Sequence, residues 1–145
     1  MCGTDYGSIE AYRDVYNEQE RIFAAHLQQC GLSDADYWIM YLINEGVDSQ
    51  KDLCAKLMIS KQTVNSACLR FAAKGLIEMK AQDSNLRTKR ITVTAKGKDF
   101  IERNVVSLLQ SEERVWQAMD ESDCKELVRI MKIYNNLMKE ELRRQ

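Results

Sequence analysis

The segment "DLCAKLMISKQTVNSACLRFAAKG", residues 52–75, decides the fold of this chain. Ser49 and Ser60 each precede a short run of helical periodicity, where a serine hydroxyl acts as an N-cap by accepting from backbone N–H groups. Asp52 follows Ser49 at the spacing of a capping box. The residues "MIS" between the two runs predict a tight turn, and Gly75 ends the second run. Two short helices joined by such a turn form a helix-turn-helix.

The second of these helices combines an apolar stripe with a polar outer face. Val64, Ala67, Cys68 and Phe71 share the inward side, whereas Gln62 and Asn65 face outward with several hydroxyls. Amides pair with adenine, and hydroxyls at a helix N-terminus suit phosphate, so we predict a DNA recognition helix. Leu69 also projects outward, as a surface leucine or as a contact for a thymine methyl group. The DNA-binding candidates here are Ser49, Ser60, Lys61, Gln62, Thr63, Asn65, Ser66 and Arg70.

After Gly75 the apolar period changes from helical to two. Ile77 and Met79 share one strand face, Ile91 and Val93 share another, and residues 81–89 between them have the polarity of a hairpin tip. We therefore predict a β-hairpin with a basic tip, which is a suitable wing to lie over the DNA backbone and place an arginine in the minor groove. The candidates here are Arg87, Lys89 and Arg90.

Helical periodicity also flanks this centre, and no proline interrupts it. We expect helices at about 8–29, from Ser33 to Asn44, at 95–117 and at 121–143, with Ser33 and Asp36 as a capping box and Asp120 or Ser122 as the last cap. The predicted fold is mainly α with a small β-hairpin wing. It is a winged helix-turn-helix with helical extensions at both ends, a single domain over 1–145 whose lobe spans about 33–98 and whose extensions span 8–30 and 99–145.

Charge divides along the same boundaries. Residues 49–98 contain eleven Lys and Arg against three Asp and Glu, although the whole chain has a net charge of -1. The flanks are therefore acidic. A basic centre between acidic flanks favours a polyanionic partner at the centre, with chance clustering of solvated lysines as the alternative.

Other classes of protein find little support in the sequence. The chain has 145 residues, 45% of them apolar, with no apolar run near 18 residues and no secretory signal, so we expect a cytoplasmic protein. Five cysteines without a C-x-x-C pair and a single histidine, His26, argue against a metal site. The sequence contains no motif that predicts a bound cofactor. No glycine-rich phosphate loop, nucleophile elbow or H-E-x-x-H motif is present, so we do not expect an enzyme.

The segments "DLCAKLMISKQTVNSACLRFAAKGLIEM" and "NLRTKRITVTAKG" resemble the signature of MarR-type transcriptional regulators. The shared motifs are D/E-L-A-x-x-L, I-S-x-x-T-V, K-G-L-I, a wing D-x-R and L-T-x-x-G. The resemblance places the wing arginine on Arg87. The acidic residue two positions before that arginine in the family is replaced by Asn85, with Asp83 two residues earlier, and Cys68 stands where the family usually has leucine. We expect Cys68 to be a small core residue.

The resemblance implies a homodimeric repressor, held together by the first helix and the last two, that binds a pseudo-palindromic double-stranded operator. Those helices carry more apolar residues than one small domain would bury. The family commonly releases DNA when a small aromatic acid or phenol binds beside the DNA-binding lobe. The candidate lining is Tyr12, Tyr16, His26, Tyr37, Trp38 and Tyr41. Packing of these aromatics in a core or interface is the alternative.

Two further functions remain open at this point. Some members of the family sense oxidants through a cysteine of the first helix, and Cys30 or Cys2 would be the candidate in a thiol-based redox-sensing repressor. A winged helix can also serve as a protein-interaction module, because the fold alone does not prescribe DNA. A steep dependence of duplex binding on salt distinguishes a DNA-binding regulator from such a module.

Overall fold

The computed structural model describes residues 7–82 and 85–145, with side chains for 7–81 and 89–145. The chain forms two compact units, one ending at Val105 and the other beginning at Val106. No helix of the described residues is both long enough and apolar enough to cross a membrane.

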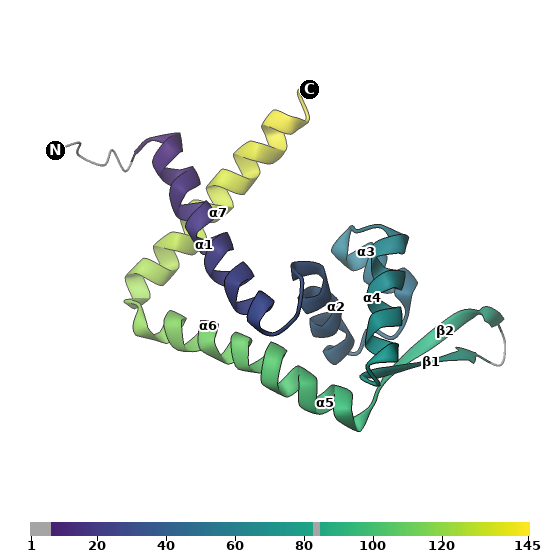
Figure 1. The fold of residues 1–145 in the computed structure, drawn as a ribbon. Helices are drawn as coiled ribbons and strands as arrows, with labels where there is room; N and C mark the ends of the chain where they lie inside the picture. Colours follow the sequence, from purple (N-terminus) through teal and green to yellow (C-terminus); the bar gives the residue numbers. More distant parts are fainter. Residues whose placement is uncertain (1–6, 83–84) are drawn as a thin grey trace. The chain divides into compact units, whose positions relative to one another are not determined.

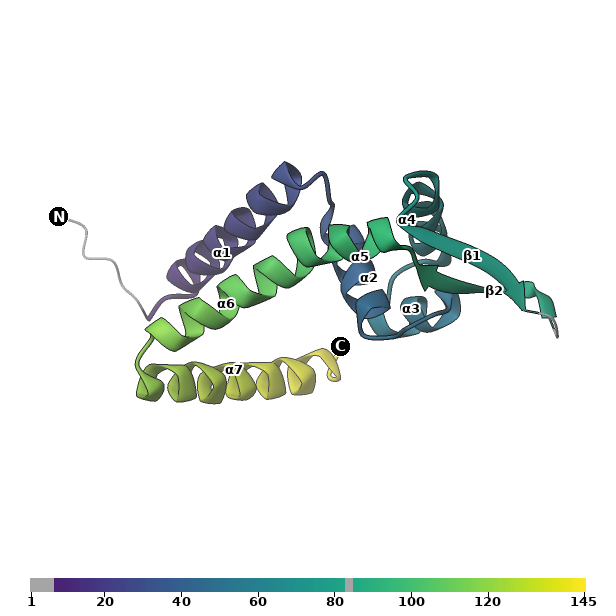
Figure 2. The ribbon, with the colours of Figure 1, turned by 90° about the horizontal axis from the view of Figure 1, so that it is seen from below.

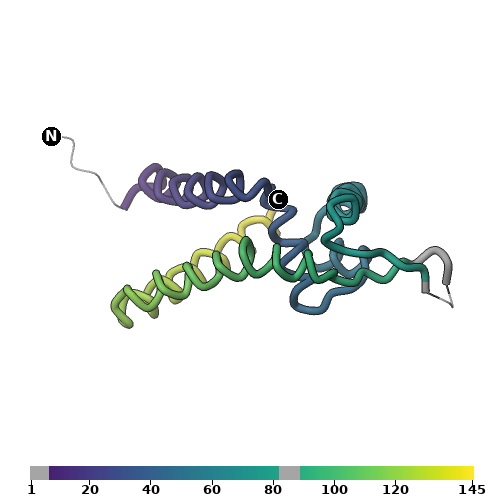
Figure 3. Tube along the Cα trace, turned by 60° about the horizontal axis from the view of Figure 1, so that its bottom comes forward, coloured from purple at the N-terminus to yellow at the C-terminus, as the bar shows by residue number. Residues whose placement is uncertain are grey.

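The first unit contains the predicted helix-turn-helix and hairpin (Figure 1). Its elements are α1 (Ile9–Gln29), α2 (Asp34–Asn44), α3 (Gln50–Leu57), α4 (Lys61–Ala73), β1 (Ile77–Gln82), β2 (Asn85–Val93) and α5 (Ala95–Ile101). The strands extend away from the cluster of α2, α3 and α4 in every view, most plainly in Figure 3. The fold is therefore the winged helix-turn-helix that the sequence predicts.

The second unit is a pair of consecutive helices. It contains α6 (Ser107–Ala118) and α7 (Glu121–Leu142), and the short link between them turns the chain back, as Figure 2 shows. Asp120, not Ser122, is the N-cap residue of α7, and its side chain makes no capping hydrogen bond.

The start of each helix in the winged-helix lobe follows from side-chain caps. The Ser33 hydroxyl accepts from the Asp36 N–H and the Asp36 carboxylate accepts from the Ser33 N–H, which confirms the predicted capping box. The Ser49 hydroxyl likewise accepts from the Asp52 N–H. Its reciprocal bond differs from the prediction, because the Asp52 carboxylate accepts from the Ser49 hydroxyl at 2.8 Å instead of from the backbone.

The predicted apolar stripe of α4 is confirmed as the centre of the core. Val64, Ala67, Cys68 and Phe71 are all buried, as is Leu53 of α3. Each large side chain buried in this way contributes about 1.5–3 kcal/mol to folding through removal of apolar surface from water. This burial fixes which face of α4 remains exposed.

The hairpin is longer than the sequence predicts. Ile77 pairs with Val93 and Met79 with Ile91, as the alternation indicates, but the ladder continues through residues 80–82 into the segment predicted as the tip. Backbone pairing does not need alternating apolar side chains, so a hydrophobic pattern marks only the part of a hairpin that packs on the core.

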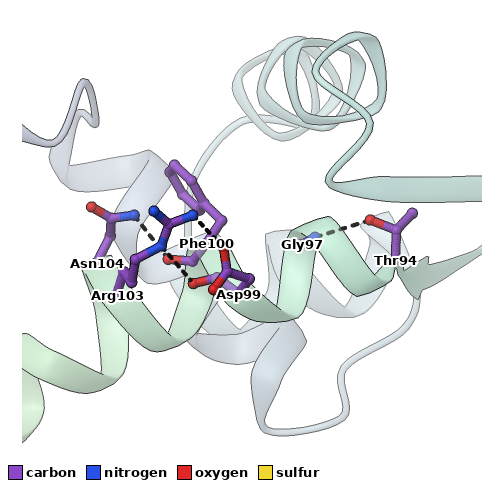
Figure 4. A network of polar contacts seen from close by, with 6 residues as sticks. All are labelled: Thr94, Gly97, Asp99, Phe100, Arg103 and Asn104. Atoms are coloured by element: carbon purple, nitrogen blue, oxygen red, sulfur yellow. Dashed lines mark hydrogen bonds and ion pairs between the residues drawn. The ribbon is translucent and has the colours of Figure 1, made fainter.

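Thr94 and Gly97 fix the hairpin to α5 at its root. The Thr94 hydroxyl donates to the Gly75 carbonyl at 2.6 Å. It also accepts from the Gly97 N–H at 2.9 Å (Figure 4). A Cβ on Gly97 would lie 1.9 Å from the Leu76 carbonyl oxygen, so no other residue fits without movement of the backbone.

The segment predicted as a helix over 95–117 is helical throughout, but a π-helical turn, Glu102–Val106, separates α5 from α6. The Asn104 amide donates to the Phe100 carbonyl at 2.8 Å, and Arg103 pairs with Asp99 (Figure 4). In the wider turn, the Asn104 side chain donates to a main-chain carbonyl oxygen that would otherwise accept from a backbone N–H. An apolar pattern carries no signal for such an insertion.

Candidate nucleic-acid interface

The N-terminal half of α4 presents a short polar face. Ser60 caps the helix, accepting from the Thr63 N–H at 3.1 Å, and the two hydroxyls lie 2.8 Å apart. The predicted residues of this face are all exposed: Ser60, Lys61, Gln62, Thr63, Asn65 and Ser66. Because the opposite side of α4 is buried, this face can meet a partner without disturbing the core.

Arg70, the last predicted DNA-binding residue of α4, has an intramolecular partner. Its Nη2 donates to Asp36 Oδ1 at 2.6 Å, and Asp36 is the only buried charged side chain among the residues whose burial is described. Arg70 thus anchors α4 to the N-terminus of α2. Sequence reasoning found the Asp36 cap but missed this second bond.

The basic residues of the wing differ in how they are held. Lys89 is exposed on β2, whereas the Arg90 Nε donates to Asp48 Oδ2 at 2.8 Å. The Ile91 N–H also donates to the Asp48 carbonyl at 2.7 Å, which fastens the hairpin to the segment before α3. Arg87 lies within β2, and its side chain falls outside the described residues.

A cavity of about 530 Å³ lies where α3, α4 and the hairpin meet. Ser49, Lys61, Asn65 and Lys89 line it, so four of the predicted residues meet at one place. Leu69, which is also predicted to face outward, lines it as well. Sequence reasoning missed the remaining lining residues, of which only Lys51 belongs to the signal of the basic centre: Gln50, Lys51, Cys54 and Met79. Three lysine ammonium groups in one concave lining favour an anionic partner.

Leu69, which the sequence places outward, is confirmed as an exposed side chain, with 53% of its surface accessible. It lies in the lining of the same cavity, beside Asn65 one turn earlier on α4. An apolar side chain at this place can contact a thymine methyl group if DNA occupies the face.

The candidate ligand residues form two sets, each on one helix. Tyr12 stacks on Tyr16 in α1 with centroids 6.2 Å apart. In α2 the Trp38 ring meets Tyr37 at 5.2 Å and Tyr41 at 5.6 Å, both edge to face. Tyr37 is buried in the core, while Trp38 is 42% exposed. The structure therefore gives Tyr37 a packing role.

The cysteines are described except for Cys2, which lies outside the described residues. Cys68 is fully buried, and burial, with a smaller contribution from Cys54, raises the pKa of its thiol to about 11. The prediction of a core cysteine is confirmed. Cys30 is half-buried, with its Sγ 3.8 Å from His26 Nε2. Within residues 7–82 and 85–145, no three His, Cys, Asp or Glu side chains gather as metal ligands.

Comparison with known proteins supports the same fold. Residues 31–87 match the sequence profile of the MarR family. This match covers α2, α3, α4, β1 and the start of β2. A search of curated protein sequences finds no significant match.

Solved MarR-family structures cover nearly the whole chain. NMB1585, a MarR family regulator from Neisseria meningitidis, has 21% identity and a TM-score of 0.69 over 92% of this chain and 95% of that one. Bordetella bronchiseptica BpsR has 16% identity and a TM-score of 0.68 over 93% and 98%. The S. aureus MepR–DNA complex has 19% identity and a TM-score of 0.65 over 88% and 96%. These likenesses establish the MarR-type fold.

Proposed function

We propose that this MarR-family protein is a sequence-specific double-stranded DNA-binding transcriptional regulator. The observation that carries the proposal is the exposed amide and hydroxyl face of α4, which stands beside a cavity lined by three lysines and the basic hairpin. In this function α4 enters the major groove, Gln62 and Asn65 read base edges, and the hairpin places Arg87 in the minor groove. The residues proposed for phosphate contacts are Ser49, Ser60, Lys61, Thr63, Ser66, Arg70, Lys89 and Arg90.

The active form in this proposal is a homodimer. Along α7, apolar side chains that recur on one face of the helix are between 36% and 61% exposed: Leu127, Ile130, Met131, Leu137 and Met138. A row of this kind on one helix is typical of an interface that a second copy covers. Two joined recognition helices then meet successive major grooves of a pseudo-palindromic operator.

The regulator acts as a repressor that a small phenol or aromatic acid releases from its operator. BpsR, whose fold this chain shares, is described as having its DNA binding regulated by 6-hydroxynicotinic acid. The proposed lining here is Tyr12, Tyr16, His26, Tyr37, Trp38 and Tyr41. Trp38 and Tyr16 offer the most exposed rings of this group, and the buried Tyr37 packs against Trp38.

Salt dependence tests the proposal. Affinity of the purified dimer for duplex DNA from its own promoter region should fall with ionic strength by about 0.9 log units per tenfold salt for each neutralised phosphate. Fluorescence anisotropy at several salt concentrations measures this slope. A protein that shows no salt-dependent binding to any duplex would instead serve a protein partner through its winged helix.

A further inference from the structure

Gln50, the first residue of α3, contacts the base-reading candidate Asn65 of α4. Its Nε2 lies 3.3 Å from Asn65 Oδ1 and 3.6 Å from the sulfur of Met79 on β1. Gln50 is half-buried between the two helices and the hairpin, whereas Asn65 is exposed. One amide group therefore touches both the recognition helix and the wing.

The chemistry of Met79 determines which way both amides face. A thioether sulfur has no hydrogen to donate, so the group of Gln50 that faces it must be the NH₂ donor. The same NH₂ donates to Asn65, which turns the Asn65 oxygen toward Gln50. The Asn65 NH₂ therefore remains available to donate to a partner molecule, since none of the described residues accepts a hydrogen bond from it.

We propose that Gln50 is a positioning residue that sets the polarity of Asn65, so that Asn65 meets DNA as a hydrogen-bond donor. This inference rests on the proposed DNA-binding function. A free asparagine pairs with adenine through both its oxygen and its NH₂. An asparagine held by Gln50 selects an edge that offers acceptors, guanine N7 and O6 or thymine O4, and disfavours cytosine, whose major-groove edge is a donor.

Substitution of Gln50 can reverse this polarity. In Gln50→Glu the carboxylate only accepts, so it draws the Asn65 NH₂ inward and turns the oxygen toward the DNA. In Gln50→Met the side chain keeps its length but loses its donor, so the Asn65 amide is free to rotate. The first variant should prefer adenine or cytosine at the contacted base, and the second should prefer adenine, with which a freely rotating asparagine pairs through both groups.

Selection from random duplex DNA with the full-length protein tests the proposal. Asn65→Ala first identifies the base pair that Asn65 contacts. Wild type should prefer guanine or thymine there by about three- to tenfold, as one net hydrogen bond supplies, and Gln50→Glu should invert the preference. The added charge of Gln50→Glu weakens binding to every sequence, so the same change in the Asn65→Ala background measures that uniform loss. Thermal unfolding checks that each variant is folded.

Two results would overturn the inference while leaving the proposed function intact. One is an Asn65-dependent preference for adenine in the wild type. The other is that Gln50→Met and Gln50→Glu both keep the base preference of the wild type. Failure of the wild type to select any sequence would overturn the proposed function and this inference together.

Discussion

Arg70 of the recognition helix donates to Asp36 at 2.6 Å, while the same Asp36 carboxylate accepts from the Ser33 N–H at 3.2 Å. One carboxylate therefore closes the N-terminus of α2 and holds α4. Asp36 is 7% exposed, so its charge needs both partners to offset the loss of water. The position of α4, the proposed recognition helix, therefore depends in part on Asp36.

Asp36→Ala should lower the free energy of unfolding by about 2–3 kcal/mol. The change removes a capping interaction and leaves Arg70 without its partner, and the half-exposed Arg70 keeps the loss below that of a fully buried pair. Urea unfolding followed by circular dichroism measures it. Arg144→Ala, which removes a largely exposed pair with Glu141, is the control and should cost less than about 0.5 kcal/mol. Equal effects of the two changes would contradict this role for Asp36.

Gly97→Ala should destabilise the protein by about 3 kcal/mol or more. The new methyl group would meet the Leu76 carbonyl at 1.9 Å, and backbone cannot move aside as a flexible side chain can. Gly31→Asn is the matched control, because Gly31 has φ +70° and open space around it, and asparagine tolerates that conformation. Thermal unfolding of both variants provides the comparison. A melting temperature of Gly97→Ala equal to that of wild type would show that the root of the hairpin is looser than described.

The titration of Cys68 should make stability fall at high pH. Its pKa is raised from 9.0 to about 11, so between these values the unfolded chain has lost a proton that the folded protein keeps. The contribution of the protonated Cys68 thiol to the free energy of unfolding is fully present below pH 9. It is lost as the pH rises toward 11, by about 2–3 kcal/mol. Urea unfolding of wild type and Cys68→Ala at pH 8, 9, 10 and 11 isolates this contribution. Parallel pH profiles for the two proteins would exclude it.

Ile130→Glu should dissociate the proposed dimer. The carboxylate would be buried without a partner in the apolar row of α7, at a cost of several kcal/mol. Asn136→Glu adds the same charge at a polar position of the same helix and should leave the dimer intact. Sedimentation equilibrium gives the mass of each protein. A monomeric wild type would refute the proposed dimer, and a dimeric Ile130→Glu would refute this part of its interface.

Lys89→Ala should weaken binding to all DNA sequences alike and reduce the salt slope by about 1, because an exposed ammonium group on the wing contributes charge to a phosphate and no base readout. Arg90→Ala should have a smaller effect on the slope, since Arg90 is already paired with Asp48. Anisotropy titrations on a selected and a scrambled duplex measure both. A loss confined to the selected duplex would make Lys89 a base-reading residue.

The helices with a periodic apolar face could be predicted from the sequence, whereas local departures from regular geometry and contacts between distant segments could not. The stripe of Val64, Ala67, Cys68 and Phe71 recurs at helical spacing because one side of α4 is buried. Serine caps mark where the helices begin. The π-turn, the outer part of the hairpin and the partners of Arg70 and Asn65 leave no such pattern in the sequence. Each depends on a contact between segments distant along the chain or on backbone geometry that apolar spacing does not encode.

The same limit applies to the candidate site. Patterns of residue type identified the polar face of α4 and the basic hairpin, but could not reveal that Gln50 and Met79 stand behind Asn65. Gln50 looked like an ordinary first residue of a helix. The proposed positioning role of Gln50 becomes visible only in the folded protein, where α3, α4 and β1 meet at one cavity.

The attachment of the hairpin has a consequence for how such a protein diversifies. Thr94, Gly97 and the bond from Ile91 to Asp48 hold the strands at their base, and the backbone ladder continues beyond residue 80. A substitution at the base disturbs these side-chain bonds or the close packing of Gly97, whereas backbone pairing further out does not depend on which side chain a residue carries. Under the proposed function, the outer strands can change in sequence to suit a different operator while the residues at the base stay the same.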